Sequence, residues 1–456
     1  MDGVAGPATD TPADLAGVEA ELNTRWPETK LEPSVDRITA LVDLLGSPHL
    51  SYPVVHIAGT NGKTSVARMV DSLLTALGLR TGRYTSPHLQ SVTERVSIDG
   101  APIDEQRYVD TYGDIAPYIA MVDATQPVPL SKFEVLTAMA FAAFADAPVD
   151  AAVIEVGMGG TWDATNVVDA TVAAVTPIGL DHADYLGADV VGIAKEKAGI
   201  VKPGSIAVLA NQPPEIMRAL LVRCSAVDAT VAREGMEFGV LSRDLAVGGQ
   251  RLRLQGLGGV YEDIFLPLHG AHQGTNAALA LAVVEAFLGA GASRRLDGDA
   301  IIEGFAAVRS PGRLERLRTA PTVFADAAHN PHGAGALATA LRDEFAFRRL
   351  VGVVATMSDK DARGILGELE PVVGQVVVTR NSSPRSASVD TLARAAVDVF
   401  GADRVTVELR LDDAVESAIR IAEEIDDDQL SGSGVVITGS VVTAGDARTL
   451  FGRDPA

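Results

Sequence analysis

The order of apolar and polar residues changes from strand-like to helix-like within residues 53–77, and the rest of the chain is organised around this stretch. A mainly β-branched run at 54–57 predicts a buried strand, which glycines at 59 and 62 interrupt. After them, apolar residues recur at the spacing of one helix face: Val66, Met69, Val70, Leu73, Leu74 and Leu77. We therefore expect a strand, a short glycine-containing loop and a helix in direct succession.

The junction between this loop and the helix has the features of a phosphate-binding site. Unpaired backbone N–H groups and the positive end of the helix dipole favour an anion at a helix N-terminus. Lys63 adds a mobile positive charge, and the hydroxyl of Thr64 can reach a metal ion bound to phosphates. The strict phosphate-loop pattern has a glycine where this chain has Ile57, so the loop is a shortened variant, and a plain glycine turn is the alternative. The order of strand, loop, Lys-Thr and helix favours a nucleoside triphosphate as the ligand.

The remaining pattern predicts alternating strands and helices in two successive parts of the chain. The first part has expected strands at 149–156 and 170–176, helices at 15–26, 35–45, 133–145, 190–199 and 277–290, and tightly turned strands within 238–268. After a hinge at 310–313, the second part has expected strands at 322–325, 350–355, 376–379 and 435–438 and helices at 334–345, 389–400 and 412–425. This alternation predicts an α/β protein of two domains.

The first predicted domain is a phosphate-loop ATPase domain with a central, mostly parallel sheet, and the second is a smaller, doubly wound α/β domain. The expected boundaries are a flexible tail at 1–25, the first domain at 26–309 and the second at 310–456. A chain of 456 residues exceeds what one hydrophobic core usually supports, which agrees with two domains.

Charge and cysteine content narrow the class of partner. The formal net charge of -22 argues against a nucleic-acid or anionic-membrane surface. The single cysteine, Cys224, cannot form an intrachain disulfide, which fits a reducing compartment. The N-terminus has neither the basic segment nor the apolar run of a signal peptide. We therefore expect a cytoplasmic protein, a monomer, that binds neither nucleic acid nor membrane.

Three further polar positions are candidates for chemistry. Glu155 ends an apolar strand, and a buried carboxylate is unfavourable unless it is paired or binds a metal; the metal is favoured over a structural ion pair. His182 follows the next strand with acidic neighbours, although imidazole is an unusual ligand for magnesium. Lys197 lies with Lys195 on the helix expected at 190–199, where a solvated charged face is the plainer reading.

A set of short motifs, in this order, resembles the folylpolyglutamate synthase and dihydrofolate synthase family, ATP-dependent ligases related to the Mur ligases. The similarity covers residues 26–448. The motifs are GTNGKTS at 59–65, TSPHL at 85–89, EVGMGG at 155–160, DATN at 163–166, Asp-His at 181–182, EKAGI at 196–200, His-Gln at 272–273 with Asn276, PGRLE at 311–315, DAAHNP at 326–331, and Gly-Ser at 439–440 with Gly445. The ordered set is far more specific than any one of its members.

The resemblance implies a role for each matching position. ATP would be bound by Gly59, Thr60, Asn61, Gly62, Lys63, Thr64, Ser65, Asn276, Arg313 and Asp326. Mg²⁺ would be bound by Ser86, Glu155 and His182. The pteroate or folate would contact Ser131, Lys132, Phe133, Glu134, Trp162, Asp163 and Ala164. L-Glutamate would lie near His329 and Ser440, and Lys197 would be carbamylated. The catalytic set would be Lys63, Glu155, His182, Lys197 and His329.

The implied reaction is amide-bond formation driven by ATP. Transfer of the γ-phosphoryl group to a carboxylate gives an acyl phosphate, and the amine of L-glutamate then displaces phosphate. The expected acceptors are dihydropteroate and reduced folates, which makes the enzyme bifunctional and places folate binding in the first domain and glutamate binding in the second. Alternatives are folylpolyglutamate synthesis alone, a Mur-type amino-acid ligase, and a nucleotide-gated binding protein without ligase activity.

Two positions depart from the family pattern. Thr161 stands where family members commonly have arginine, which removes a guanidinium from that place. Thr64 stands where many members have glycine, and it restores the hydroxyl of other phosphate loops. No residue stands out as the base that deprotonates glutamate; His329 and a phosphate oxygen are the two candidates.

Overall fold

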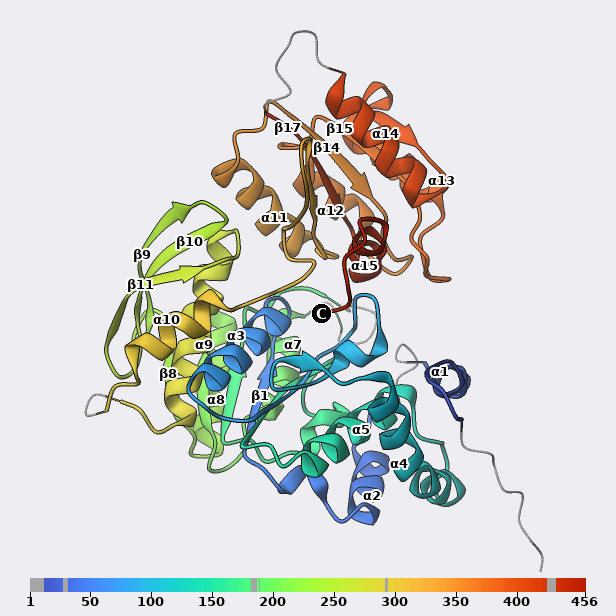
Figure 1. The fold of residues 1–456 in the computed structure, drawn as a ribbon. Coiled ribbons are helices and arrows are strands. Elements are labelled where there is room, and N and C mark those ends of the chain that lie inside the picture. Colours follow the sequence, from blue (N-terminus) through green and yellow to red (C-terminus); the bar gives the residue numbers. More distant parts are fainter. Residues whose placement is uncertain (1–11, 28–31, 182–186, 188, 292–293, 425–431) are drawn as a thin grey trace, which may run out of the picture.

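The computed structural model describes residues 12–27, 32–181, 187, 189–291, 294–424 and 432–456. Figure 1 shows two α/β parts, one above the other, with the C-terminus between them. The lower, N-terminal part has an eight-stranded sheet in the order β4-β3-β2-β5-β1-β6-β7-β8. Its strands are β1 (Val54–Ala58), β2 (Thr81–Tyr84), β3 (Val96–Ile98), β4 (Ala101–Pro102), β5 (Ala151–Glu155), β6 (Val172–Val175), β7 (Ile206–Leu209) and β8 (Thr230–Arg233). Along the sheet, the six strands β2, β5, β1, β6, β7 and β8 each pair in parallel with the next. The predicted central, mostly parallel sheet is therefore confirmed.

Helices cover both faces of this sheet because successive strand residues point to opposite sides. On one face, Val55 and Ile57 pack in the core with α3 (Lys63–Ala76), α9 (Ala271–Phe287) and α10 (Gly298–Ala306). On the other face, Val54 packs in the core of α1 (Leu15–Thr24), α2 (Asp36–Leu44), α4 (Glu105–Thr125) and α5 (Lys132–Asp146). A third cluster joins β6 and β7 to α7 (Val190–Lys197) and α8 (Pro214–Ala226).

The expected N-terminal tail is only partly described. Residues 1–11 lie outside the described residues. Leu15–Thr24 forms α1, whose Val18 and Leu22 are fully buried in the core that also holds residues of α4. The prediction of a flexible tail is therefore wrong for this segment, because its apolar face packs on the first domain.

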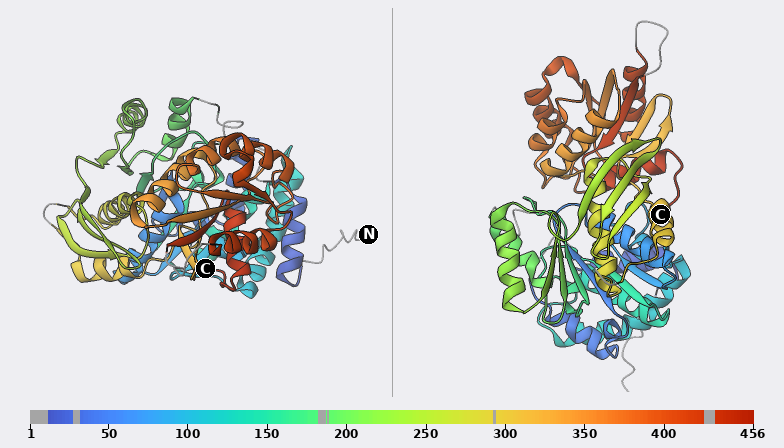
Figure 2. Two further views of the ribbon diagram at one scale, coloured as in Figure 1. Left: turned by 90° about the horizontal axis from the view of Figure 1, so that it is seen from above. Right: turned by 90° about the vertical axis from the view of Figure 1, so that its left-hand side faces the viewer.

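A small antiparallel sheet is inserted before α9, as the alternating residues at 238–268 predict. Its strands are β9 (Gly239–Ala246), β10 (Gly249–Gln255) and β11 (Val260–Leu266). The sheet rises beside the C-terminal part (Figure 2), where Arg243 of β9 pairs with Glu344. The helix after it begins at Ala271, earlier than the expected 277, so Gln273 and Asn276 lie within the helix.

The C-terminal part is a six-stranded sheet in the order β12-β13-β17-β14-β15-β16, parallel except for β12. Its strands are β12 (Glu315–Thr319), β13 (Thr322–Ala325), β14 (Arg349–Val354), β15 (Gln375–Val378), β16 (Val405–Val407) and β17 (Ser433–Thr438). One face is covered by α11 (Pro331–Glu344), α12 (Ala362–Leu369) and α13 (Val389–Phe400), and the other by α14 (Leu411–Glu423) and α15 (Val441–Leu450). The predicted doubly wound domain is confirmed.

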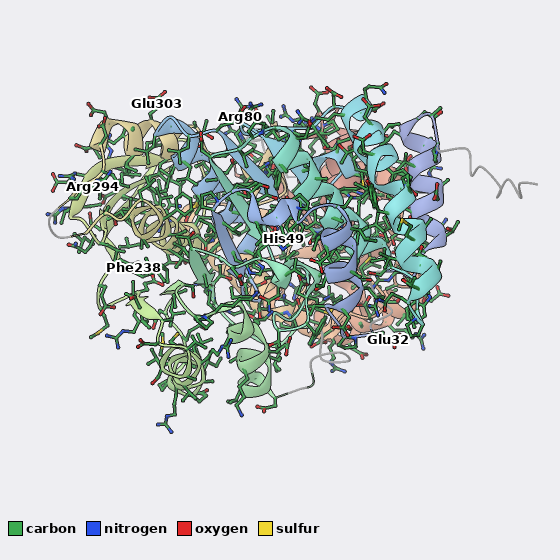
Figure 3. The ribbon with its side chains drawn as sticks, turned by 90° about the horizontal axis from the view of Figure 1, so that it is seen from below. Glu32, His49, Arg80, Phe238, Arg294 and Glu303 are labelled. Carbon is green, nitrogen blue, oxygen red and sulfur yellow. The ribbon has the colours of Figure 1, made fainter. Side chains whose placement is uncertain are left out.

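Side chains fill the space between the sheets and their helices. In the view from below (Figure 3), buried His49 lies toward the middle, whereas exposed Arg80 and Glu303 lie toward the rim. Within the part of the chain that the structure describes, no helix combines the length and the apolar character needed to cross a bilayer.

Candidate active site

Two cavities, each of about 300 Å³, adjoin between the two domains. The glycine-loop cavity is lined by residues 59–65 and by residues of α9 and α11. The aromatic cavity is lined by Trp26, Phe133 and Trp162 together with polar groups of both domains. The shared wall consists of Ser86, Pro87, Gly157, Met158, His329 and Val441. Both cavities lie where the carboxyl ends of β1 and β5 face those of β13 and β17, the usual position of ligands in open α/β sheets.

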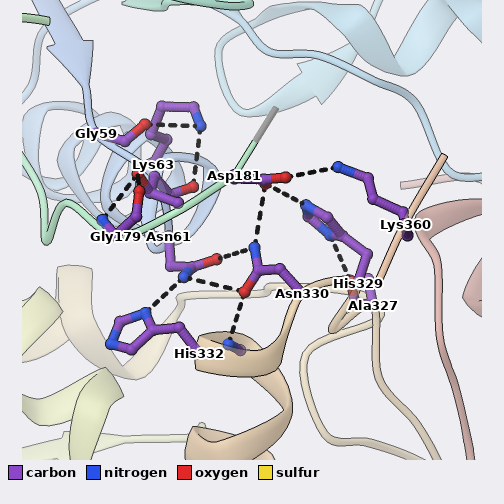
Figure 4. A network of polar contacts seen from close by, with 12 residues as sticks. Gly59, Asn61, Lys63, Gly179, Asp181, Ala327, His329, Asn330, His332 and Lys360 are labelled. Atoms are coloured by element: carbon purple, nitrogen blue, oxygen red, sulfur yellow. Dashed lines mark hydrogen bonds and ion pairs between the residues drawn. The ribbon is translucent and has the colours of Figure 1, made fainter. Parts of the chain in front are cut away.

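The glycine loop connects β1 to α3 and is shaped by two glycines with positive φ. Gly59 has φ +145° and Gly62 has φ +90°, conformations that other residues adopt with strain. A Cβ atom on Gly62 would lie 2.7 Å from Oδ1 of Asn276. Lys63 Nζ donates to the carbonyl oxygens of Gly59 (3.1 Å) and Thr60 (3.2 Å), so the ammonium group lies over the loop (Figure 4). The expected phosphate-loop geometry is present.

Glu155 lies at the end of β5 beside this loop, and its side chain is almost fully buried. Thr64 Oγ1 donates to both carboxylate oxygens, at 3.0 and 3.1 Å, and the Ser86 backbone donates as well. Burial raises the pKa of Glu155, while the positive charge of Lys63 and the Thr64 hydrogen bond act against that rise. Among the described residues no three His, Cys, Asp or Glu side chains cluster as a metal site. Beside the Glu155 carboxylate lie the hydroxyl of Thr64 and, in the same cavity wall, Ser86; His182 lies outside the described residues.

Lys197, at the end of α7, is buried and lines the glycine-loop cavity, whereas Lys195 on the same helix is exposed. Burial, together with the positive charge of Lys63, lowers the pKa of Lys197 to about 7. The reading as a solvated charged face thus holds for Lys195 and is wrong for Lys197. Thr161 is not part of either cavity wall; its hydroxyl donates to the carbonyl oxygen of Glu196 at 3.1 Å.

The opposite wall of the glycine-loop cavity brings together the other predicted nucleotide residues. Asn276 Nδ2 donates to Oε1 of Gln273 at 3.1 Å within α9. Asp326, at the end of β13, accepts backbone N–H groups of Leu314 and Ala328, both at 2.8 Å. Burial raises the pKa of Asp326, and the neighbouring Arg313 acts against that rise.

A polar network joins the two domains across this cavity (Figure 4). Asp181 accepts from Lys360 Nζ at 2.6 Å and from Asn330 Nδ2 at 3.1 Å, and it lies 3.2 Å from Nε2 of His329. Asn330 Nδ2 also donates to Oδ1 of Asn61 at 3.2 Å. The sequence interpretation included Asp181 and His329 but missed Lys360. Its position just beyond the strand predicted at 350–355 could have indicated it, because ligands bind at the carboxyl ends of such strands.

The aromatic cavity combines aromatic rings with a buried carboxylate. Asp163 accepts the backbone N–H of Met158 (2.8 Å) and both the N–H (2.9 Å) and the hydroxyl (2.5 Å) of Thr165. Burial raises the pKa of Asp163, and the Met158 and Thr165 hydrogen bonds act against that rise. The predicted wall residues present in this cavity are Ser131, Phe133, Glu134, Trp162, Asp163, Ala164 and Ser440.

Lys132 is the predicted folate contact that the structure does not bring into this cavity. Its Nζ atom donates to Glu19 (3.2 Å) and Asn23 (2.9 Å) of α1, outside the cavity wall. Glu134 lines the cavity but also has structural partners, since it pairs with Arg37 at 3.0 Å and caps the start of α5 with Ser131.

Two family models match the chain on either side of the domain junction. The Mur ligase middle domain matches residues 57–284, and the Mur ligase glutamate ligase domain matches residues 312–441. The two domains are thus those of the Mur ligase family.

Individual relatives narrow this class. The dihydrofolate synthase/folylpolyglutamate synthase of Mycobacterium tuberculosis is 61% identical over 98% of this chain and 96% of the relative, and that of Bacillus subtilis is 30% identical over 92% and 95%. The structure of the M. tuberculosis folylpolyglutamate synthase complexed with ADP superposes with a TM-score of 0.93 at 61% identity, covering 97% of this chain and 99% of that one. Escherichia coli FolC in complex with DHPP and ADP superposes with a TM-score of 0.83 at 29% identity over 97% and 98%. The chain belongs to the dihydrofolate synthase/folylpolyglutamate synthase family.

Proposed function

We propose that this protein is a bifunctional, ADP-forming ligase that uses ATP to add L-glutamate to dihydropteroate and to reduced folates. The observation that carries the proposal is the wall shared by the two cavities, which includes Ser86, Gly157 and His329. A nucleotide on the glycine loop would place its terminal phosphate at this wall. An aromatic acceptor in the second cavity would place its carboxylate on the other side of the same wall, so the two reacting groups would meet.

ATP would occupy the glycine-loop cavity, in agreement with the ADP in the related structures. The backbone N–H groups at the start of α3 and the Lys63 ammonium would hold the phosphates. Asn276, Arg313 and Asp326 would hold the rest of the nucleotide from the opposite wall. Because these groups belong to both domains, nucleotide binding would favour their closed arrangement.

The oxygen donors beside the glycine loop fit Mg²⁺, which prefers carboxylate and hydroxyl oxygens. Glu155 and Ser86 would hold the ion, with His182 as the third proposed ligand. When bound, the ion would neutralise the charge that develops on the transferred phosphoryl group.

Lys197 is the proposed site of carbamylation. Its amine would add to CO₂, forming an N–C bond and releasing one proton, which leaves a carbamate anion in place of the ammonium. This reaction needs the neutral amine, and a pKa of about 7 provides a large neutral fraction at physiological pH. The resulting oxygens would lie in the glycine-loop cavity, where Lys197 is part of the wall.

The acceptor would bind in the aromatic cavity, with its bicyclic ring against Phe133 and Trp162 and its N–H groups toward Asp163. His329 and Ser440 are the proposed contacts of L-glutamate. Lys360 and Arg385, which also line this cavity, add the positive charge that a dicarboxylate needs.

The chemistry would proceed in two steps. A carboxylate oxygen of the acceptor attacks the γ-phosphorus, the bond to the bridging oxygen breaks, and ADP leaves with that electron pair. The glutamate amine then attacks the acyl carbon, phosphate leaves, and the amine loses a proton to His329 or to a phosphate oxygen. The contacts of Asp181 and Asn61 with the C-terminal domain would keep water away from the acyl phosphate.

The test is phosphate release by the purified protein with ATP, Mg²⁺ and L-glutamate, with dihydropteroate, with tetrahydrofolate and with neither. We expect release that depends on glutamate with either acceptor. If only tetrahydrofolate supports phosphate release, the protein is a folylpolyglutamate synthase without dihydrofolate synthase activity. If neither dihydropteroate nor tetrahydrofolate supports release, the proposal is refuted. Lys63→Met should abolish release, whereas Lys195→Met, which changes an exposed lysine of α7, should not.

We propose the cytoplasm as the compartment and a monomer as the active state. A single cysteine and a strongly acidic composition support a reducing compartment and a well-solvated surface.

A further inference from the structure

A histidine, His56, lies in the middle of the central strand, and the proposed reaction does not use it. His56 belongs to β1, is fully buried, and has Val55 and Ile57 as its strand neighbours. Its Nε2 atom lies 2.9 Å from Oγ1 of Thr165. Its Nδ1 atom has no hydrogen-bond partner among the residues that the structure describes. An apolar side chain would fill this core position without leaving a buried nitrogen unpaired.

The directions of the hydrogen bonds follow from the single hydrogen of the Thr165 hydroxyl. That hydroxyl donates to Oδ1 of Asp163 at 2.5 Å, and the same oxygen also accepts the backbone N–H of Thr165. Thr165 must therefore accept from His56, which assigns the hydrogen of the imidazole to Nε2. Burial lowers the pKa of His56 to about 3, so the ring is neutral at physiological pH and offers one N–H group.

The hydrogen bonds that begin at His56 lead to Asp163, a residue of the aromatic cavity. Oδ1 of Asp163 accepts the N–H and the hydroxyl of Thr165, and Oδ2 accepts the backbone N–H of Met158. Both carboxylate oxygens therefore have hydrogen-bond donors. Asp163 also lines the aromatic cavity, as do its chain neighbours Trp162 and Ala164. Two backbone N–H groups and one side-chain hydroxyl hold this carboxylate, and His56 contacts the hydroxyl, which is the only side-chain donor among these three.

We propose that His56 is a positioning residue for the acceptor: by donating to Thr165, it fixes the Asp163 carboxylate in the orientation that receives N–H groups of a pterin-type ring. This inference rests on the proposed function and deepens it. His56 and the glycine loop belong to the same strand-loop unit, because β1 ends at Ala58 and Gly59 follows. One strand thus supports both the acceptor contact and the phosphate loop.

The experiment compares binding of dihydropteroate to the full-length protein and to two pairs of variants. His56→Leu and Thr165→Val each remove a hydrogen bond between His56 and Asp163. His56→Gln keeps a donor at position 56, and Thr165→Ser keeps the hydroxyl at position 165. Binding is followed by quenching of tryptophan fluorescence, because both tryptophans of the chain, Trp26 and Trp162, line the cavity. Binding of ATP is measured in parallel.

We expect the Kd for dihydropteroate to rise about tenfold in His56→Leu and Thr165→Val, which corresponds to about 1.4 kcal/mol. The conservative variants should bind within about twofold of the unchanged protein, and the Kd for ATP should stay constant in all four. The double variant His56→Leu/Thr165→Val should be no weaker than Thr165→Val alone, since both changes interrupt one chain. Nitrogen NMR of the unchanged protein should show the hydrogen of His56 on Nε2.

Several results would overturn the inference. These are unchanged dihydropteroate binding in a folded Thr165→Val, additive effects in the double variant, an equal loss of ATP affinity, or a hydrogen on Nδ1 of His56. If His56→Leu does not fold, the Thr165 pair decides, because it leaves β1 intact. If the unchanged protein binds neither dihydropteroate nor a reduced folate, the proposed function fails together with the inference; if it binds them and Thr165→Val binds equally, the inference alone fails.

Discussion

Replacing Lys197 by methionine should stabilise the protein while it abolishes ligase activity. The pKa of Lys197 falls from 10.5 to about 7 on folding because the ammonium is buried. At neutral pH this difference opposes folding by about 4 kcal/mol, which methionine, a residue of similar length without a charge, would remove. The cavity would retain its shape but lose the amine that the proposed carbamylation needs.

The dependence of this effect on pH follows from the direction of the pKa shift. Between about pH 7 and pH 10.5 the unfolded chain binds the proton that the folded protein releases, so the stability of the unmodified protein rises with pH in this window. Below pH 7 both states are protonated and the full penalty remains. The stabilisation by Lys197→Met should therefore fall from about 4 kcal/mol at pH 7 to about 2 kcal/mol at pH 9.

The assay is denaturant unfolding of the unchanged protein and of Lys197→Met from pH 6 to pH 9 in buffers free of CO₂, so that the amine is not modified. Lys195→Met is the matched control, because Lys195 is exposed on the same helix and its replacement should leave the stability unchanged at every pH. A Lys197→Met variant that is no more stable, or whose added stability does not change with pH, would refute the reasoning. Phosphate release measured on the same preparations reports the loss of activity.

Three further predictions follow from the site and the domain junction. Gly62→Ala and Gly78→Ala both introduce a side chain at positive φ, and each should lower the free energy of unfolding by about 1 kcal/mol. Only Gly62→Ala should raise the KM for ATP, because its Cβ would meet Asn276. Equal KM values for the two variants would refute this. Lys360→Met should raise the KM for L-glutamate at least tenfold without changing the Kd for ATP, and an unchanged KM would exclude the glutamate contact. Glu344→Gln should lower the free energy of unfolding by about 2 kcal/mol, because the buried carboxylate accepts from Arg243, His269 and Gly270; a melting temperature equal to that of the unchanged protein would contradict this.

Local features of the sequence were sufficient for the parts of the fold that depend on neighbouring residues. The strand, glycine loop and helix at 53–77 were predictable because the apolar spacing and the glycine at 62 lie within one short stretch. The structure shows Gly62 at the positive φ that glycine adopts readily. The doubly wound C-terminal domain was predictable because its buried strands alternate with strongly amphipathic helices such as α13 and α14. By contrast, α4 was missed, since Pro117 interrupts a weakly amphipathic pattern that only packing against its neighbours stabilises.

The candidate site shows the same division. The motifs named Glu155, Asp163 and His329, but no spacing along the chain could show that Lys197 is buried while Lys195 is exposed, because burial depends on which elements cover each helix face. Nor could it show that Lys132 lies outside the cavity that Phe133 lines.

The sequence by itself determined the types of element, the phosphate loop and the identity of most groups available for chemistry, since these are set by residues close together in the chain. The tertiary structure decided which groups meet. Asp181 pairs with Lys360, and His56 reaches Asp163 through Thr165, across sequence separations that only the packing of two sheets and their connecting loops can close. Burial of the same groups then sets their pKa values, because the dielectric environment belongs to the folded protein and not to the residue.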